Sequence, residues 1–305
     1  MNKFTLKKDL LINEIKWCLG CGNYSIIVQL SRLFEKLKIN KKKTIIISGI
    51  GCSSRLPYYM KLNNYHTIHG RAFSIATGIK LTNYKYKIWI ITGDGDAFSI
   101  GLNHLLHTIR RNININILIF NNGVYALTKG NLSYTNFNNK FNFNIIYLIL
   151  SAGATFIART LDSNPKHLRK ILYKANKYKG TSCVEIIQNC PIYNNIKNKN
   201  NNKIFLKNKK PLIFSKNKCI TLLNNIFNPK IKIKNLNTLK NNNNIWYHDQ
   251  NNNYKAFLLS QFNSINKKLP IPFGIFYKIK IKKKISKIKK KKLKLLKLYK
   301  KNFIF

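Results

Sequence analysis

The amino-acid sequence predicts an α/β fold, in which a parallel sheet carries helices on both faces. Short runs rich in β-branched residues alternate along the chain with longer segments whose apolar residues recur at helical spacing. The 305 residues also suffice for one large α/β domain with additions. Sheets of this kind bind their ligands at the carboxyl ends of the strands, and the sequence there is the first place to seek a site.

The predicted elements follow one another from residue 23. Residues 23–37 form the first helix, because Ile26, Leu30, Leu33 and their apolar neighbours share one face. This helix precedes a series of strands that are separated by helical patterns. Strands are predicted at residues 44–48, 87–92, 115–120 and 182–187, and helices at residues 72–81, 100–111 and 165–178.

The composition changes after Tyr193 and divides the chain into three predicted parts. Residues 1–193 carry the patterns of the α/β domain. Residues 194–277 are rich in Asn and Lys with few periodic segments, so we expect loops and a weakly packed extension. Residues 278–305 mix Lys with Ile and Leu, and we interpret them as a basic solvated tail, with a basic amphipathic helix as the alternative.

The charge balance alone would suggest a nucleic-acid partner. The chain has 56 Lys and Arg against 8 Asp and Glu, a net charge of +48. However, Lys, Asn, Ile, Phe and Tyr are all enriched together, as codons rich in A and T produce, and the basic residues are scattered. Compositional drift is therefore the favoured explanation, and a basic nucleic-acid-binding protein is kept as the alternative from another functional class.

No run of residues approaches the roughly 18 apolar positions that a membrane-spanning helix needs, and the first residues lack the apolar core of a signal peptide. We expect a soluble cytoplasmic protein without a membrane partner. Its six cysteines then lie in a reducing compartment, where clustered cysteines indicate metal or redox chemistry more often than disulfides.

Two polar motifs follow successive predicted strands. Gly93-Asp94-Gly95-Asp96 ends one strand, Asn121-Asn122 ends the next, and 25 residues separate Gly95 from Asn121. This pattern resembles the signature of thiamine diphosphate enzymes. Magnesium prefers oxygen ligands, and Asp94, Asn122 and the backbone carbonyl of Val124 offer three. The glycines would let the backbone approach a diphosphate closely, whereas Asp96 is as compatible with a helix N-cap as with a cofactor contact.

Four cysteines stand in motifs that suit metal binding. Cys18 and Cys21 form a C-x2-C pair, Cys52 lies in a glycine-rich segment, and Cys190 precedes a proline. Four such thiolates can hold a 4Fe-4S cluster, although a zinc site and a dithiol redox pair remain alternatives. Of the two other cysteines, Cys183 lies in an apolar strand pattern and is expected in the core, and Cys219 is expected to be incidental.

The chain resembles the β subunit of a 2-oxoacid:ferredoxin oxidoreductase. The matching motifs are WCLGCG, SGIGCSSRLP, HTIHGRAFSIATGIK, GDGDAFSIGLNHLLHTIRRN and NNGVYALTKG, nearly continuous from Trp17 to about Asn194 and weaker afterwards. The resemblance implies a thiamine diphosphate-binding fold with Mg2+ and a 4Fe-4S cluster. It also implies an oxidoreductase that decarboxylates a 2-oxoacid, passes electrons through the cluster to ferredoxin and transfers the acyl group to coenzyme A.

The resemblance also assigns residues to roles. Cys18, Cys21, Cys52 and Cys190 would be the cluster ligands, which favours iron-sulfur over zinc because the reaction needs an electron acceptor. The residues at the thiamine cofactor would be Gly49, Ile50, Gly51, Cys52, Ser53, Gly93, Asp94, Gly95, Asp96, Asn122 and Val124. His69 and Arg71 fall in a matching motif, and a structural role near a helix start remains the alternative for both.

On the substrate side, Arg55 lies where longer-chain members of the family place a basic residue toward the distal carboxylate of 2-oxoglutarate, although an ordinary surface Arg is a rival interpretation. Leu127 and Lys129 match positions near the substrate. The resemblance therefore favours 2-oxoglutarate, which would yield succinyl-CoA and CO2. A pyruvate-type enzyme and a non-redox thiamine diphosphate enzyme remain alternatives.

One catalytic group is missing from the sequence. Thiamine catalysis needs a carboxylate beside the aminopyrimidine as a proton relay. Glu14, Glu35 and Glu185 are the three glutamates of the chain, and none matches the family position for that role. We therefore expect an α subunit to supply it in an obligate heteromer, a dimer of heterodimers with active sites between subunits.

Overall fold

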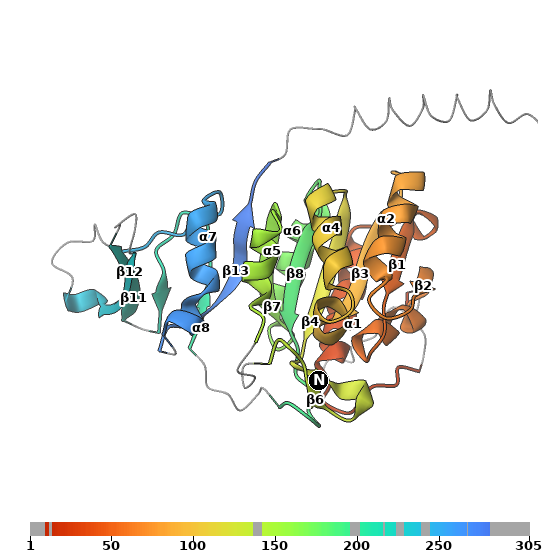
Figure 1. The fold of residues 1–305 in the computed structure, drawn as a ribbon, viewed down its shortest axis with the longest axis horizontal. Coiled ribbons are helices and arrows are strands. Elements are labelled where there is room, and N and C mark those ends of the chain that lie inside the picture. Colours follow the sequence, from red (N-terminus) through yellow and green to blue (C-terminus); the bar gives the residue numbers. More distant parts are fainter. Residues whose placement is uncertain are drawn as a thin grey trace, which may run out of the picture.

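The computed structural model describes residues 10–11, 14–136, 142–195, 202–215, 217–223, 229–238, 245–266 and 268–280. The predicted tail, apart from its first three residues, lies outside these ranges. Within them the chain forms a main sheet of eight strands in the order β2-β1-β3-β4-β8-β7-β13-β9 (Figure 1). The strands are β1 (Thr44–Ser48), β2 (Asn63–His66), β3 (Lys87–Gly93), β4 (Ile115–Asn121), β7 (Phe156–Leu161), β8 (Ser182–Ile187), β9 (Lys203–Phe205) and β13 (Ile271–Lys278).

The central strands are parallel, which confirms the predicted fold class. β1, β3, β4, β8 and β7 pair in parallel register, and the antiparallel pair in this sheet is β13 on β7. Consecutive parallel strands require crossovers, and these are the helices. The carboxyl ends of β1, β3 and β4 consequently lie side by side at one edge of the sheet.

Helices cover both faces of the sheet (Figure 1). Alternate residues of each strand face opposite cores. Ile88 and Ile90 of β3 belong to the core that includes buried residues of α2, α4, α5 and α7, whereas Trp89 and Ile91 belong to the core that includes buried residues of α1 and α6. The ring of Trp89 lies 5.3 Å from that of Phe34 in α1, edge to face. The helices are α1 (Gly22–Lys36), α2 (Ala72–Thr82), α3 (Asp94–Phe98), α4 (Leu102–Arg111), α5 (Ile145–Ser151), α6 (Pro165–Lys177), α7 (Asn253–Ser260) and α8 (Phe262–Ile265).

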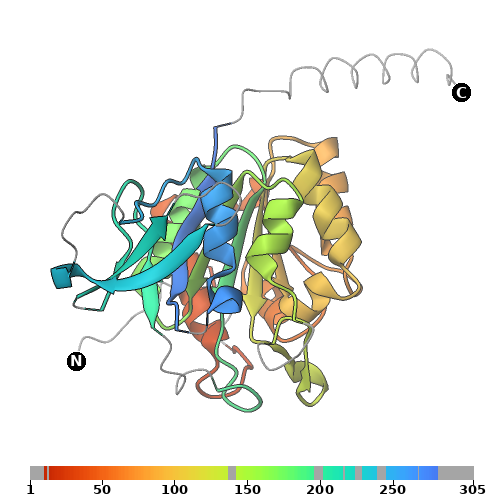
Figure 2. The ribbon, with the colours of Figure 1, turned by 60° about the vertical axis from the view of Figure 1, so that its left-hand side comes forward.

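The expectation of loops and weak packing after Tyr193 is wrong for the described residues of that region. β13 and β9 extend the main sheet, α7 packs on it, and Leu259 and Phe276 are completely buried. A second sheet, β10 (Ile213–Phe214), β11 (Lys218–Leu223) and β12 (Lys230–Asn235), stands beside α7 (Figure 2). Its central strand β11 has four consecutive buried residues from Cys219 to Leu222, whereas β12 alternates between half-buried isoleucines and exposed lysines. The predicted three-part domain division itself stays a prediction.

Short elements complete the fold around the carboxyl edge. The hairpin β5 (Val124–Tyr125) and β6 (Asn131–Leu132) follows β4, and short 3-10 helices connect the larger elements. These are η1 (Lys41–Lys43), η2 (Ser53–Tyr59), η3 (Ala126–Thr128) and η4 (Leu236–Thr238). In the part of the chain that the structure describes, no helix has the length and apolar character required to cross a membrane.

His167 in α6 makes the fold sensitive to acid. Thr160 Oγ1 lies 2.8 Å from its Nδ1, and burial, aided by Lys170 and Lys174, lowers the pKa of His167 from 6.5 to about 4. The unfolded chain therefore binds one more proton than the folded chain between these pH values, and stability is lost as pH falls from 6.5 to 4. In denaturant titrations across this range, His167→Gln should show a shallower decline than the wild type. Parallel curves would contradict the assignment.

Candidate cofactor and metal site

A cleft of about 110 Å3 opens where the carboxyl ends of β1, β3 and β4 meet. Gly49, Arg55 and Lys129 are not among its lining residues. Twelve of the residues predicted from the sequence line it: Ile50, Gly51, Cys52, Ser53, His69, Gly93, Asp94, Gly95, Asp96, Asn122, Val124 and Leu127.

Asp94 is the charged centre of the cleft. It is 2% exposed, and its Oδ2 accepts hydrogen bonds from Ser133 Oγ at 2.5 Å and Thr135 Oγ1 at 2.6 Å. Burial raises the pKa of this carboxyl, and the two hydroxyl donors only partly offset the effect. Within the described residues no cationic side chain forms a salt bridge with Asp94. A bound divalent cation would supply the missing compensation, so these residues fit a magnesium ion.

The two asparagines after β4 form a tightly bonded turn. Asn121 Oδ1 accepts the N–H of Gly123 at 3.2 Å, and Asn122 Oδ1 accepts the N–H of Val124 at 3.0 Å. Gly123 has a φ of +72°, a conformation that glycine adopts without strain. Asn122 and Val124 thus face the same cleft as Asp94, in a fixed backbone. Their role as magnesium ligands stays a prediction.

Asp96 connects two loops rather than starting a helix. The helix α3 begins at Asp94 with Gly93 as its N-cap, so the interpretation of Asp96 as an N-cap is wrong. Its carboxylate accepts from Thr92 Oγ1 and from Gly70 N, both at 2.8 Å, and from Ile50 N at 3.3 Å.

His69 also approaches this carboxylate. Its Nδ1 lies 2.8 Å from Asp96 Oδ1, although the ring N–H is not aligned for a hydrogen bond. At Gly49 a Cβ would lie 2.0 Å from Asp96 Oδ2, so glycine is required there to let the loop approach the carboxylate. Whether Asp96 or His69 also touches a cofactor stays a prediction.

Gly95 is required by a neighbouring ring. A Cβ at this position would lie 2.4 Å from Cε1 of Tyr125. The sequence analysis attributed both motif glycines to the approach of a diphosphate, and for Gly95 the structure gives the tyrosine ring as the immediate reason. Tyr125 lines the cleft itself and was not among the predicted site residues.

The four predicted cluster cysteines gather beside the cleft. Burial, together with the neighbouring thiols of Cys190, Cys52 and Cys18, raises the pKa of Cys21 to about 11. Gln188 Nε2 donates to Cys21 Sγ at 3.3 Å, and Trp17 Nε1 donates to the carbonyl oxygen of Cys52 at 2.8 Å.

The thiols do not converge on one point. Among the described residues no three His, Cys, Asp or Glu side chains lie close enough together to hold a single metal ion. Cys183 is completely buried in the core, as predicted, and Cys219 belongs to the small sheet. The cluster ligand set stays a prediction.

Of the predicted substrate residues, Leu127 lines the cleft, whereas Arg55 and Lys129 do not. The Arg55 guanidinium lies 5.9 Å from the ring centroid of Tyr59, and Lys129 is exposed at a φ of +69°. Leu127 lines the cleft and is 53% exposed. The two basic residues, Arg55 and Lys129, therefore do not join the apolar residues that line the cleft.

The sequence analysis missed Ser133 and Thr135. Both hydroxyls reach Asp94 across about 40 residues of sequence, from the segment after β6. No periodic pattern marks them, because the chain turns after Leu132 and the Asn136 N–H donates to Ser133 O at 3.2 Å.

The site lies within a recognised domain. A family model described as "Thiamine pyrophosphate enzyme, C-terminal TPP binding domain" matches residues 49–186. The 2-oxoglutarate oxidoreductase subunit KorB of Mycobacterium tuberculosis is 46% identical over 192 residues, which is 59% of this chain and 52% of that subunit. The 2-oxoglutarate synthase subunit KorB of Archaeoglobus fulgidus is 36% identical over 192 residues, 59% of this chain and 72% of the relative.

A solved structure is similar over nearly the whole chain. The 2-oxoglutarate:ferredoxin oxidoreductase of Magnetococcus marinus, with 2-oxoglutarate, coenzyme A and succinyl-CoA bound, aligns with a TM-score of 0.72 at 26% identity. The match covers 95% of this chain and 94% of that chain. By sequence, in contrast, the match spans about half the length of the mycobacterial relative.

Gly95→Ala tests the packing of the motif. The new methyl group must displace the Tyr125 ring, and we expect the free energy of unfolding to fall by about 1–3 kcal/mol. Tyr125→Ala removes the clash, so the double variant should lose less stability than the sum of the single variants in denaturant titrations. Simple additivity would show that the ring is not the obstacle.

Proposed function

This chain belongs to the β subunits of the 2-oxoacid:ferredoxin oxidoreductases, and we propose that it binds thiamine diphosphate with Mg2+ in the cleft and a 4Fe-4S cluster at Cys18, Cys21, Cys52 and Cys190. The proposed reaction is the coenzyme A-dependent oxidative decarboxylation of a 2-oxoacid, with electrons passed to ferredoxin. The observation that carries the proposal is Asp94, a buried carboxylate without a cationic side-chain partner in the described structure, which lines the same cleft as Asn122.

The chain's own residues divide the work at this site. Asp94, Asn122 and the carbonyl of Val124 would hold the magnesium ion and thereby the diphosphate. When bound, thiamine diphosphate supplies a carbon nucleophile for the keto group and a temporary store for its electrons. Phe120 and the apolar residues of the cleft exclude water from the reacting end.

One loop connects the two proposed sites. Ile50, Gly51 and Ser53 line the cleft, while Cys52 between them also lies within electrostatic reach of Cys190 and Cys18. Two hydrogen bonds fix this loop. Thr67 Oγ1 donates to Ser48 O, and the Ile50 N–H donates to Asp96 Oδ1. The short path from cleft to thiol favours electron transfer over a non-redox thiamine reaction.

The proposed reaction favours iron-sulfur over zinc. Zinc has no redox chemistry, whereas a 4Fe-4S cluster can take up the electrons that the decarboxylation releases. The pKa of the Cys21 thiol is raised in part by the other three cysteines, which supports a shared site for the four thiols.

The proton relay would come from another subunit. Of the glutamates, Glu14 is 78% exposed at its side chain and Glu185 is paired with Arg159, and no glutamate of the described residues lines the cleft. We therefore propose an obligate assembly with an α subunit, with ferredoxin as the electron acceptor. The names of the relatives and the molecules bound by the Magnetococcus enzyme support 2-oxoglutarate as the substrate.

Anaerobic copurification with the α subunit tests the two proposed sites separately. The wild-type complex should contain about four irons and one thiamine diphosphate per β chain. Asp94→Asn should lose the thiamine diphosphate but keep the iron, because only the magnesium end is weakened, and Cys52→Ser should lose iron first. Zinc in place of iron, or a wild-type complex without thiamine diphosphate, would contradict the proposal.

Arg55→Ala tests the substrate. If the guanidinium pairs with the distal carboxylate, KM for 2-oxoglutarate should rise about tenfold or more while kcat/KM for pyruvate is unchanged. Arg55→Lys is the matched control, since it keeps the charge and should recover part of the loss. Equal effects on both substrates would show that Arg55 does not select the longer acid.

A further inference from the structure

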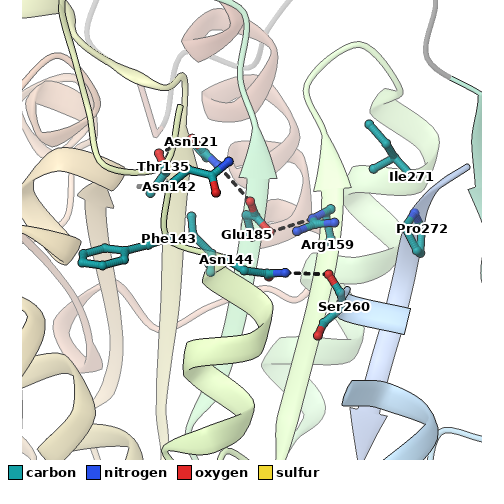
Figure 3. Close-up of a pocket in the computed structure, with 11 residues that line it drawn as sticks. Asn121, Thr135, Asn142, Phe143, Asn144, Arg159, Glu185, Ser260, Ile271 and Pro272 are labelled. Atoms are coloured by element: carbon teal, nitrogen blue, oxygen red, sulfur yellow. Dashed lines mark hydrogen bonds and ion pairs between the residues drawn. The ribbon is translucent and has the colours of Figure 1, made fainter. Parts of the chain in front are cut away.

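A buried ion pair lies behind the cleft and has no part in the proposed function. Arg159 in β7 and Glu185 in β8 are register partners, and Arg159 Nε donates to Glu185 Oε2 at 2.7 Å. Their side chains are 10% and 2% exposed. Figure 3 shows them around a small pocket together with Asn121 and Thr135. Burying two charges costs free energy, and a buried ion pair often stabilises a fold no more than apolar residues would. Stability alone therefore does not explain why this pair is present.

Glu185 fixes the orientation of the Asn121 amide. Asn121 Nδ2 donates to Glu185 Oε1 at 2.9 Å (Figure 3). An ionised carboxylate can only accept hydrogen bonds, so the NH2 group must face Glu185 and Oδ1 must face the other way. There Oδ1 accepts the N–H of Gly123 and thereby holds the turn that presents Asn122 and Val124.

A second branch leads to Asp94. Thr135 Oγ1 lies 3.0 Å from Asn121 Oδ1 and 2.6 Å from Asp94 Oδ2, so its single proton serves both acceptors. Ser133 Oγ, the second donor to Oδ2, lies 3.0 Å from Thr135 Oγ1. A continuous series of side-chain contacts therefore runs from Arg159 through Glu185, Asn121 and Thr135 to Asp94.

We propose that Glu185, paired with Arg159, is a positioning residue for the magnesium end of the site, acting through the Asn121 amide on Asp94 and on the turn that carries Asn122. This inference rests on the proposed function. Neither Arg159 nor Glu185 touches the cleft, so neither is a catalytic residue. Partners in the surroundings of a metal site commonly contribute about ten- to a hundredfold to metal affinity.

Glu185→Gln disturbs the amide without changing the shape of the side chain. Because Arg159 only donates, the substituted amide would turn its oxygen to Arg159 and its NH2 group to Asn121. The Asn121 amide must then rotate and present its own NH2 group to the N–H of Gly123, which breaks that contact, and to Thr135 Oγ1, which would accept a hydrogen bond from Asn121 where it now donates one. Thr135→Val removes the last link, and Thr135→Ser, which keeps the hydroxyl, is its matched control.

Two further variants separate positioning from folding. The double variant Arg159→Met with Glu185→Leu removes the ion pair without leaving a buried charge, so its stability should be higher than that of Glu185→Gln. The Asn121 amide, however, still lacks the carboxylate that fixes its orientation. Ser182→Ala removes a buried hydrogen bond between β8 and β4, Ser182 Oγ to Asn116 Oδ1 at 2.8 Å, away from the network. It should lower stability alone.

The quantity to measure is the apparent Kd of Mg2+ at a fixed, saturating concentration of thiamine diphosphate, by calorimetry on the copurified complex. Thermal unfolding of the cofactor-free complex is measured in parallel. We expect Kd to rise about 10- to 100-fold in Glu185→Gln, in the Arg159 and Glu185 double variant and in Thr135→Val. It should stay within about threefold of the wild type in Thr135→Ser and Ser182→Ala.

Two outcomes would overturn the inference in distinguishable ways. If the wild type binds Mg2+ with thiamine diphosphate and Glu185→Gln binds it equally well, or if affinity follows unfolding temperature across all variants, Glu185 is only structural and the proposed function is untouched. If the wild-type complex shows no Mg2+-dependent binding, the proposed function fails and this inference fails with it.

Discussion

The burial of the Asp94 carboxylate at the end of β3 is the constraint on which the site depends. A carboxylate removed from water needs compensation, and Ser133 and Thr135 supply two hydroxyl donors to one of its oxygens. The cleft, the turn after β4 and the hairpin β5–β6 are all arranged around this group. The proposed divalent cation would complete this compensation.

A second buried carboxylate organises the neighbouring loops. Asp96 accepts hydrogen bonds from Thr92, Gly70 and Ile50, and so joins the strand end to the segment that carries Cys52. The close approach of Gly49 shows how little space this contact leaves. Through it, the proposed thiamine and iron-sulfur sites would share one edge of the sheet, as the proposed electron transfer between them needs.

Sequence reasoning recovered the features whose signals are local. β1 and β8 were predicted with their observed bounds, and the spacing of Gly93-Asp94-Gly95 and Asn121-Asn122 identified the cleft. β7 was missed because Arg159 and Thr160 interrupt its apolar run, and their partners, Glu185 and His167, stand elsewhere in the chain. Ser133, Thr135 and Tyr125 were missed for the same reason, since their contacts depend on the folded chain rather than on neighbours in sequence.

The position of the metal tests the account most directly. Mn2+ can replace Mg2+ and is located by anomalous diffraction, so crystals of the anaerobic α/β complex with Mn2+ and thiamine diphosphate would show the ion. We predict one anomalous peak at the cleft, about 2.0–2.3 Å from Asp94, Asn122 and the carbonyl oxygen of Val124. A diphosphate bound without a metal, or a peak that does not touch Asp94, would contradict the account.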